Sequence, residues 1–262
     1  MKNVLQEIID YKYIEVERHS KSLPIAKLEK SIFFDRKCIS LKNALLNSKN
    51  HGIISEFKRK SPSKGMFNDQ FTVEEITTGY IEAGAEALSV LTDFNYFGGT
   101  LGDLTLARTL NNCPVLRKDF MVDEYQIVAA KACGADVILL IAAGIDSKLL
   151  NRLAKFAKSL GLETLLEIKE KEELDGNLSE YIDIVGVNNR NLKNFTVDIN
   201  SSKELSQFIP DSFVKISESG INKPEVIHEL ETYGYKGFLM GEAFMQTPHP
   251  VVSIQNFIKS LS

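Results

Sequence analysis

Helical patterns alternate with short apolar runs along most of the chain. Four segments share a glycine that can end a helix in the left-handed conformation, then a short spacer and a β-rich apolar run: AGAEALSV from Ala83, CGADVILL from Cys133, LGLETLLE from Leu160 and YGYKGFLM from Tyr233. Further apolar runs lie near Ile53, Val115, Ile184 and Val214, so the pattern predicts eight strands. Between them, apolar residues at spacings of three and four predict helices in VEEITTGYIEAG, EYQIVAAKACG, SKLLNRLAKFAKSLG and KPEVIHELETYG.

The repeated unit predicts an α/β fold. The runs VILLI and FLM are apolar throughout, which is typical of strands covered on both faces of a parallel sheet. Eight such units in about 250 residues predict a single (β/α)8 barrel, the TIM barrel. A doubly wound open sheet is the alternative, but no glycine-rich dinucleotide turn follows the first strand. The segment before the first strand contains the helical patterns VLQEIIDYKYIEVE and SLKNALLN, so we expect residues 1–50 to cap the barrel as an N-terminal helical extension within one domain, 1–262.

Composition narrows the class of protein. The chain has 262 residues, 44% of them hydrophobic, and a net charge of −4. No basic stripe is interleaved with aromatic residues, so we expect no nucleic-acid partner. We expect a small phosphorylated molecule as the substrate and a monomer or weak homo-oligomer. The longest apolar stretch, Val137 to Ile145, is shorter than the ~18 residues that cross a bilayer, so no membrane partner is expected. The first twenty residues lack an apolar signal core, which favours a cytoplasmic location.

The cysteines and histidines do not indicate a metal site or a disulfide framework. The three cysteines are an odd number and lack CxxC spacing, so we expect reduced packing residues. The four histidines show neither HxH nor HExxH spacing. Because the sequence ends at Ser262, shortly after the eighth unit, no fused second enzyme is expected.

Charged or polar residues recur at the ends of the predicted strands. Glu56 and Lys58 are two residues apart, so they lie on one face of the first strand. Later strands carry the other candidates near their ends: Lys118, Glu167, Asn188 and Glu218. Catalytic groups of such barrels come from the C-terminal strand ends. Any one of the charged residues, such as Glu218 or Lys118, could form an ion pair at the barrel mouth, but the coincidence of such endings on five strands favours an active site.

Two segments after the seventh and eighth strands are candidates for binding phosphate. KISESGI contains Ser219 and Gly220, and FLMGEAF contains Gly241 and Glu242. Barrels often bind phosphate here on backbone N–H groups, which glycine exposes. After the first strand, SPSKG contains Ser61 and Pro62 and predicts a loop able to close over a ligand; an ordinary turn is the alternative.

These motifs occur together in one known family. EFKRKSPSKG, LSVLTDFNYFGG, PVLRKDF, ADVILLI, LLEI, VGVNNRNL, KISESGI and MGEAF, in this order, resemble indole-3-glycerol phosphate synthase of tryptophan biosynthesis. The resemblance runs from about Ile53 to Met245. The N-terminal extension also matches the family, in which it caps the barrel and helps to shape the site.

The resemblance implies a reaction and a set of roles. 1-(o-Carboxyphenylamino)-1-deoxyribulose 5-phosphate would close to indole-3-glycerol phosphate with loss of CO₂ and water, without a cofactor or metal. Lys118 would be the general acid that protonates the ketone oxygen, Glu167 the base in the later dehydration, and Lys58 and Glu56 assisting groups. An ammonium suits the first step because negative charge develops on the ketone oxygen. The division of labour between the two lysines stays open.

Further residues would bind or orient the substrate. Asn188 and Glu218 would hydrogen-bond its hydroxyls and orient the acid and the base. Arg190 would be a carboxylate or loop partner, unless it forms only a structural ion pair. An aromatic-ring wall could come from Pro62, Phe97, Phe120 and Leu192, although core packing is the alternative for both phenylalanines. Ala243 departs from the family, which commonly has a hydroxyl residue there.

Three other functions remain as alternatives. Phosphoribosylanthranilate isomerase is a phosphate-binding barrel that works with a cysteine and an aspartate, whereas this chain has Glu56 and Lys58 on the corresponding strand. A Schiff-base aldolase would use a strand-end lysine as a nucleophile. A non-catalytic barrel that binds a phosphorylated metabolite would be expected to have lost acid or base residues, and none of the candidates is missing.

Overall fold

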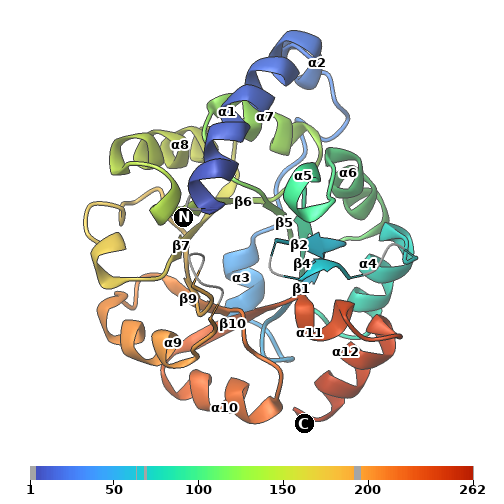
Figure 1. Cartoon of the computed structure of the whole chain (residues 1–262), viewed down its shortest axis with the longest axis vertical. Coiled ribbons are helices and arrows are strands. Elements are labelled where there is room, and N and C mark those ends of the chain that lie inside the picture. The colour runs from blue at the N-terminus through green and yellow to red at the C-terminus, as the bar shows by residue number, and fades with distance from the viewer. Residues whose placement is uncertain (1–3, 63, 68–69, 192–195, 262) are drawn as a thin grey trace.

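The computed structural model describes residues 4–62, 64–67, 70–191 and 196–261. Eight parallel strands close into a barrel in the order β1-β10-β9-β8-β7-β6-β5-β4 (Figure 1). Their bounds are β1 Ile53–Phe57, β4 Ala87–Leu91, β5 Val115–Lys118, β6 Val137–Ile141, β7 Glu163–Ile168, β8 Ile184–Asn188, β9 Val214–Glu218 and β10 Tyr235–Met240. The predicted (β/α)8 barrel and all eight predicted strands are therefore confirmed.

Helices surround the barrel. Those around its sides are α4 Val73–Glu82, α6 Leu101–Leu110, α7 Glu124–Ala132, α8 Ser147–Ser159, α9 Asn200–Leu205, α10 Pro224–Thr232 and α12 Pro250–Lys259. Short elements at the loops are the hairpin β2 Lys60–Ser61 and β3 Gly65–Met66, α5 Phe94–Phe97, α11 Glu242–Met245 and the 3₁₀ turns η1 Ala142–Gly144, η2 Lys171–Glu173 and η3 Ser206–Phe208. The four glycines predicted to end helices all have positive φ, namely Gly84, Gly134, Gly161 and Gly234.

Local sequence accounts for these helices, as α8 illustrates. The Asp146 side chain accepts a hydrogen bond from the Leu149 N–H and so caps the helix. Leu150, Leu153, Ala154 and Ala157 recur at spacings of three and four and are buried. Their apolar face packs on the barrel, while the lysines of the helix face away from this core.

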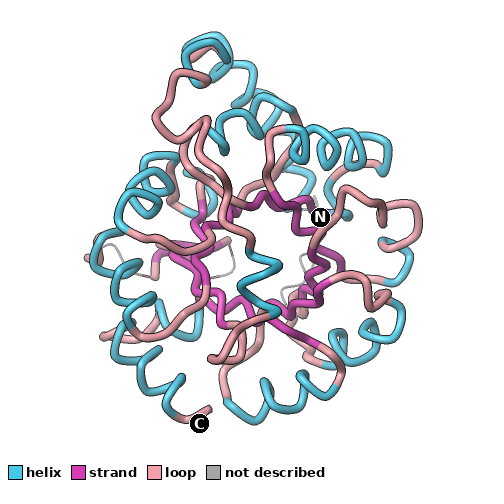
Figure 2. Tube along the Cα trace, turned by 180° about the vertical axis from the view of Figure 1, so that it is seen from behind, coloured by secondary structure: helices cyan, strands magenta, loops and turns pink. Residues whose placement is uncertain are grey.

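The N-terminal extension covers both ends of the barrel. Helix α1 (Val4–Ser22) lies at the end where the strands finish, and α2 (Ile25–Leu28) packs on α7. Helix α3 (Leu41–Leu46) contacts β9 and β10 where those strands begin, and Figure 2 shows it crossing the barrel from behind. The helical patterns within residues 1–50 predicted a cap on the rim; the structure adds a second cap at the opposite end.

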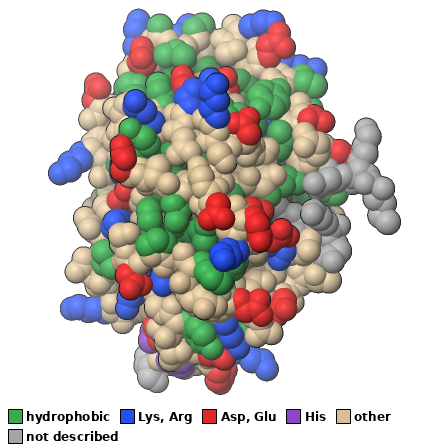
Figure 3. Space-filling model, turned by 90° about the vertical axis from the view of Figure 1, so that its left-hand side faces the viewer, with side chains coloured by type: hydrophobic (Ala, Val, Ile, Leu, Met, Phe, Trp, Pro, Cys, Tyr) green, Lys and Arg blue, Asp and Glu red, His purple; other side chains and the backbone are tan. Residues whose placement is uncertain are grey.

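Apolar side chains fill both the barrel interior and the layer beneath the helices. The interior cluster, which includes Leu116, Leu165 and Leu239, is continuous with buried residues of α1 and α3. On the face drawn in Figure 3, acidic and basic side chains are intermixed rather than gathered by sign. Among the described residues, the helices all lack the length and apolarity required to cross a membrane.

Candidate active site

A cavity of about 600 Å³ opens at the C-terminal ends of the strands. It is lined by 15 of the 16 residues proposed for the site from the sequence, Glu56, Lys58, Ser61, Pro62, Phe97, Lys118, Phe120, Glu167, Asn188, Arg190, Glu218, Ser219, Gly220, Gly241 and Glu242. The remaining residue, Leu192, lies outside the described residues. A smaller cavity of about 300 Å³ shares Glu167, Asn188 and Arg190 with the first. Strand ends that are far apart in sequence thus converge on one space.

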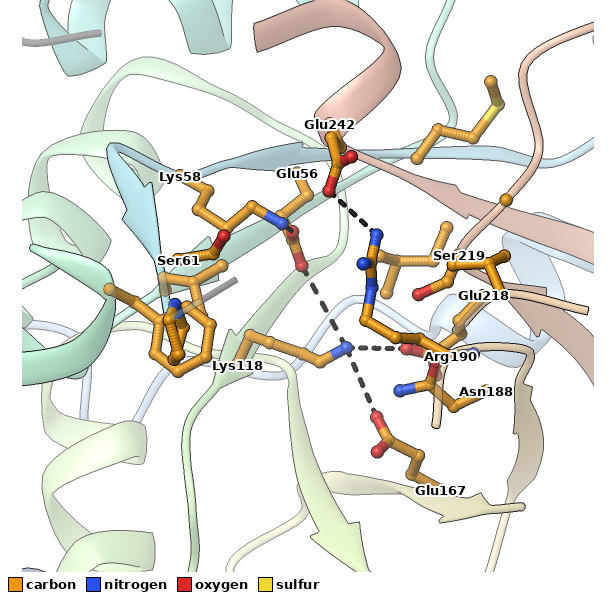
Figure 4. Close-up of a pocket in the computed structure, with 18 of the residues that line it drawn as sticks. Glu56, Lys58, Ser61, Lys118, Glu167, Asn188, Arg190, Glu218, Ser219 and Glu242 are labelled. Atoms are coloured by element: carbon orange, nitrogen blue, oxygen red, sulfur yellow. Dashed lines mark hydrogen bonds and ion pairs between the residues drawn. The ribbon is translucent and has the colours of Figure 1, made fainter. Parts of the chain in front are cut away.

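A cluster of buried charges occupies the floor of this cavity (Figure 4). Lys118 Nζ lies 2.6 Å from Glu218 Oε2 and 3.4 Å from Glu167 Oε2. It lies 4.0 Å from Glu56 Oε2, while the other oxygen of Glu56 is 2.8 Å from Lys58 Nζ. Each carboxylate therefore has an ammonium neighbour, and Lys118 is held among three carboxylates from three other strands.

This arrangement controls the ionisation of the cluster. Burial alone would lower the pKa of Lys118, but the charges of Glu218, Glu167 and Glu56 outweigh it and raise that pKa well above its usual range. Burial would raise the pKa of Glu56, yet Lys58 and Lys118 hold it below its usual value. Burial, together with the charge of Glu167, raises the pKa of Glu218 to about 7. Near neutral pH the site thus contains a fixed ammonium beside a carboxyl that can gain or lose a proton.

Two glycines leave room for the carboxylates. A Cβ at Gly186 in β8 would lie 2.5 Å from Glu218 Oε1, and a Cβ at Gly241 would lie 2.7 Å from Glu56 Oε1. Both distances are shorter than real Cβ contacts, so any side chain at either position would displace a charged group. Gly186 lies in β8, which pairs with the strand of Glu218, β9. Gly241 directly follows β10, which pairs with the strand of Glu56, β1. Each glycine therefore leaves space for a carboxylate of the neighbouring strand.

The segments proposed to bind phosphate lie side by side at the cavity. Ser219 and Gly220 both have positive φ, 68° and 79°, and a Cβ at Gly220 would lie 2.4 Å from the Val197 side chain. Gly241 immediately precedes α11. Both segments line the cavity, and their glycines allow the backbone to approach an anion there.

Arg190 and Glu242 pair with each other across the cavity. Arg190 Nη2 donates to Glu242 Oε2 at 2.9 Å, and the Arg190 backbone N–H donates to Asn188 Oδ1. The other oxygen of Glu242 lies 2.6 Å from Lys64 Nζ. The ion-pair alternative for Arg190 is thus seen in the structure, within the cavity wall rather than away from it.

Aromatic and aliphatic side chains complete the cavity. The rings of Phe97 and Phe120 are 5.9 Å apart and both line it, so they are exposed to a ligand as well as packed. Helix α1 adds Val4, Leu5 and Ile8.

Some residues that line the cavity were not predicted from the sequence, among them Lys64 and those of α1. Lys64 lies in the predicted loop SPSKG, but nothing in the sequence showed that its side chain reaches Glu242. The residues of α1 have the periodicity of a buried helix face, which by itself does not distinguish a cavity wall from a core.

Comparison with known proteins agrees with this geometry. The family described as indole-3-glycerol phosphate synthase matches residues 5–259. Indole-3-glycerol phosphate synthase of Bacteroides thetaiotaomicron is 47% identical over 100% of both chains, and that of Caldanaerobacter subterraneus subsp. tengcongensis is 40% identical over 98% of both. A solved structure titled "Native KDPGal structure" has a TM-score of 0.56 at 13% identity, covers 80% of this chain and 91% of its own, and shows a shared fold only. The chain belongs to the indole-3-glycerol phosphate synthase family of decarboxylating carbon–carbon lyases in tryptophan biosynthesis.

Proposed function

We propose that the Lys118 cluster closes the indole ring of the family's substrate, 1-(o-carboxyphenylamino)-1-deoxyribulose 5-phosphate, within the cavity described above. The ring carbon that bears the carboxylate attacks the ketone carbon, the ketone oxygen gains a proton, and CO₂ leaves. Loss of that oxygen as water then gives indole-3-glycerol phosphate. The observation that carries the proposal is the ammonium of Lys118 fixed among Glu218, Glu167 and Glu56.

Lys118 contributes first as a fixed positive charge. Its raised pKa keeps it protonated, so it stabilises the negative charge that develops on the ketone oxygen. A strongly raised pKa weakens an acid, but the alkoxide that forms is a much stronger base and still takes the proton. Lys58, paired with Glu56, supplies a second cation on the same strand face.

Glu167 is the proposed base for the dehydration. Its carboxylate lies across Lys118 from Glu56 and also borders the smaller cavity (Figure 4). A base at this place can remove the proton whose loss expels the hydroxyl as water. Asn188 and Glu218 lie on the adjoining strands β8 and β9 and would orient the substrate hydroxyls and Lys118.

The phosphate would bind at Ser219, Gly220 and Gly241. Those residues line the cavity at the ends of β9 and β10, where glycine lets backbone N–H groups approach an anion. Glu242 carries the wrong charge to bind phosphate directly, so we propose that it holds Arg190 and Lys64 in place. This refines the substrate-binding role that sequence analysis gave to Glu242.

The three free cysteines agree with a cytoplasmic enzyme. Cys38, Cys113 and Cys133 are all described and all lack a disulfide. Reduced thiols of this kind are usual where glutathione and thioredoxin operate.

The test is turnover of the synthetic substrate by the purified full-length chain, followed by the fluorescence of the indole product. We expect product from the wild-type chain and, for Glu167→Gln, slow turnover with accumulation of a ring-closed intermediate in single-turnover experiments. Full activity of Glu167→Gln would remove this residue from the dehydration. Borohydride trapping separates the aldolase alternative, because a stable adduct on Lys58 or Lys118 would contradict acid–base catalysis by these lysines.

A further inference from the structure

Two histidines and a glutamate meet at the end of the barrel opposite the active site. His51 precedes β1, whereas His228 and Glu231 lie one turn apart near the end of α10. His51 Nδ1 is 2.7 Å from Glu231 Oε1, and His228 Nδ1 is 3.7 Å from Glu231 Oε2. One ligand atom from each residue lies within 4.8 Å of the other two. We propose that these three residues bind one divalent transition-metal ion such as Zn²⁺.

The donor set suits this class of ion. Neutral imidazole nitrogens with one carboxylate favour Zn²⁺, Co²⁺ or Ni²⁺ over Mg²⁺ and Ca²⁺, which prefer oxygen ligands only. Three protein ligands leave a fourth position for water. With bonds near 2.1 Å, tetrahedral ligands lie roughly 3.4 Å apart. The His51–Glu231 pair at 2.7 Å would therefore open slightly, while His228 would move toward the other two residues from its present position within 4.8 Å. His228 and Glu231 are partly exposed and can rotate to do so.

The backbone presents His51 in a fixed position. His51 has φ 59°, which is uncommon for a residue other than glycine. Gly52 follows with φ 66°, and a Cβ there would lie 2.1 Å from the Lys236 carbonyl oxygen, so the turn is pressed against β10. A bound ion would therefore tie this turn to α10 and stabilise the fold.

Metal titration of the tag-free, chelator-stripped full chain tests this site. With ZnCl₂ we expect calorimetry to show one equivalent bound and the Tm to rise with the ZnCl₂ concentration. When Co²⁺ is added in place of Zn²⁺, we expect an absorption band from the bound ion. His228→Gln and Glu231→Gln should each weaken binding by at least about tenfold, since even outer-shell changes cost 10–100-fold. His249→Gln, outside the cluster, is the matched control. No binding by the wild type, or equal binding by the cluster variants, would overturn the proposal.

A different observation concerns a buried lysine of the N-terminal extension. Lys12 in α1 has no exposed surface, and its Nζ lies 2.9 Å from each of Glu15 Oε1, Asp93 Oδ2 and Asp119 Oδ1. Burial would lower its pKa, but Asp119 and Asp93 raise it above its usual range, so it stays charged. Asp93 follows β4, and Asp119 follows Lys118 at the end of β5.

Both aspartates hold cavity residues. Asp93 Oδ1 accepts hydrogen bonds from the N–H groups of Tyr96 and Phe97. Asp119 Oδ1 accepts from the Phe120 N–H, and its Oδ2 accepts from Thr92 and Arg117. The geometry therefore points to Lys12 as a positioning residue, which connects the extension to the strand end that carries Lys118.

Without Lys12, the carboxylates of Asp93 and Asp119 would be buried with only Arg117 to balance them. Repulsion would move α5 and the end of β5, and with them Phe97, Phe120 and Lys118. The expected effect on kcat rests on the proposed role of Lys118, but the expected displacement of α5 and the end of β5 does not.

The test compares Lys12→Met with Lys21→Met, an exposed lysine of the same helix that pairs with Glu17. Per folded molecule, well below Tm, we expect kcat to fall 10–100-fold for Lys12→Met, with recovery in Lys12→Arg and no change for Lys21→Met. A purely structural role would lower Tm and leave kcat per folded molecule unchanged. Independently of activity, the amide NMR signals of Phe97 and Phe120 should shift only in Lys12→Met. Unshifted signals would refute the positioning role even if the proposed reaction failed.

Discussion

Two buried carboxylates at opposite ends of the barrel, Asp136 and Glu218, are paired in different ways. At the end where the strands begin, Asp136 is fully buried and has four donors. They are Arg36, Arg108 and the backbone N–H groups of Ile39 and Val115. At the other end, Glu218 is 1% exposed, but only one of its oxygens has a partner, Lys118. Glu218 Oε1 is buried without a hydrogen-bond partner among the described residues.

The difference separates a structural charge from a reactive one. A carboxylate whose two oxygens both accept hydrogen bonds from charged and backbone donors holds elements of the fold together. One that is partly satisfied, beside other carboxylates and a cavity, has a shifted pKa and can exchange a proton. Location at a strand end does not decide between the two, because both residues adjoin a strand terminus.

The largest expected effect is on turnover at the cavity end. Lys118→Ala removes the fixed cation, so kcat should fall by on the order of 10²–10⁴ while substrate still binds. Product fluorescence measures kcat. A titration with substrate under single-turnover conditions measures the affinity of the variant for the substrate. Turnover near that of the wild type would mean that the cavity charges are structural too.

Next in size is a loss of stability at the opposite end. Asp136→Asn keeps the shape but leaves Arg108 buried without its charge partner, so the free energy of unfolding should fall by about 3–5 kcal/mol. Urea denaturation measures this, and kcat per folded molecule should stay unchanged. A large loss of kcat with little loss of stability would contradict a purely structural role for Asp136.

The pH dependence of activity is a further test of the reactive role of Glu218. With the pKa of Glu218 raised to about 7, the carboxylate that orients Lys118 becomes protonated as pH falls below 7, and kcat should drop about tenfold per pH unit. In Glu218→Gln the acid limb should disappear at a lower overall rate. An unaltered acid limb in that variant would assign the titration to another group.

The smallest expected effect concerns the phosphate segment. Ala243 borders the cavity directly after Glu242. Ala243→Ser adds a hydroxyl that can donate to phosphate, worth at least about 1.5 kcal/mol if the bond forms, and KM should fall by about tenfold. Ala243→Val is the control that adds volume without a donor. Equal KM values for the serine variant and the wild type would place phosphate away from this position.

Much of the barrel follows from local sequence. The runs near Ile53, Val115, Ile184 and Val214 became strands because their burial on both faces favours continuous apolar residues. Gly134 and Gly161 end their helices because the left-handed conformation costs glycine little. The charged strand endings were also visible, and parallel strands require those ends to meet on one face.

Other features depend on contacts between distant segments. Lys12 and Asp136 carry no local sign of their partners, because ion pairs across the fold leave no periodicity in the sequence. The cluster of His51, His228 and Glu231 was missed for the same reason, since its first member is far along the chain from the other two.

The amino-acid sequence is sufficient to predict the barrel, the family and the residue types that end the strands, because these depend on periodicity, turn chemistry and long motifs. Which of those charges are fully paired, and which face the cavity, is visible only once the chain is folded. Pairing depends on distances of a few ångströms between side chains that folding alone brings together, and on small residues such as Gly186 that leave space for a carboxylate.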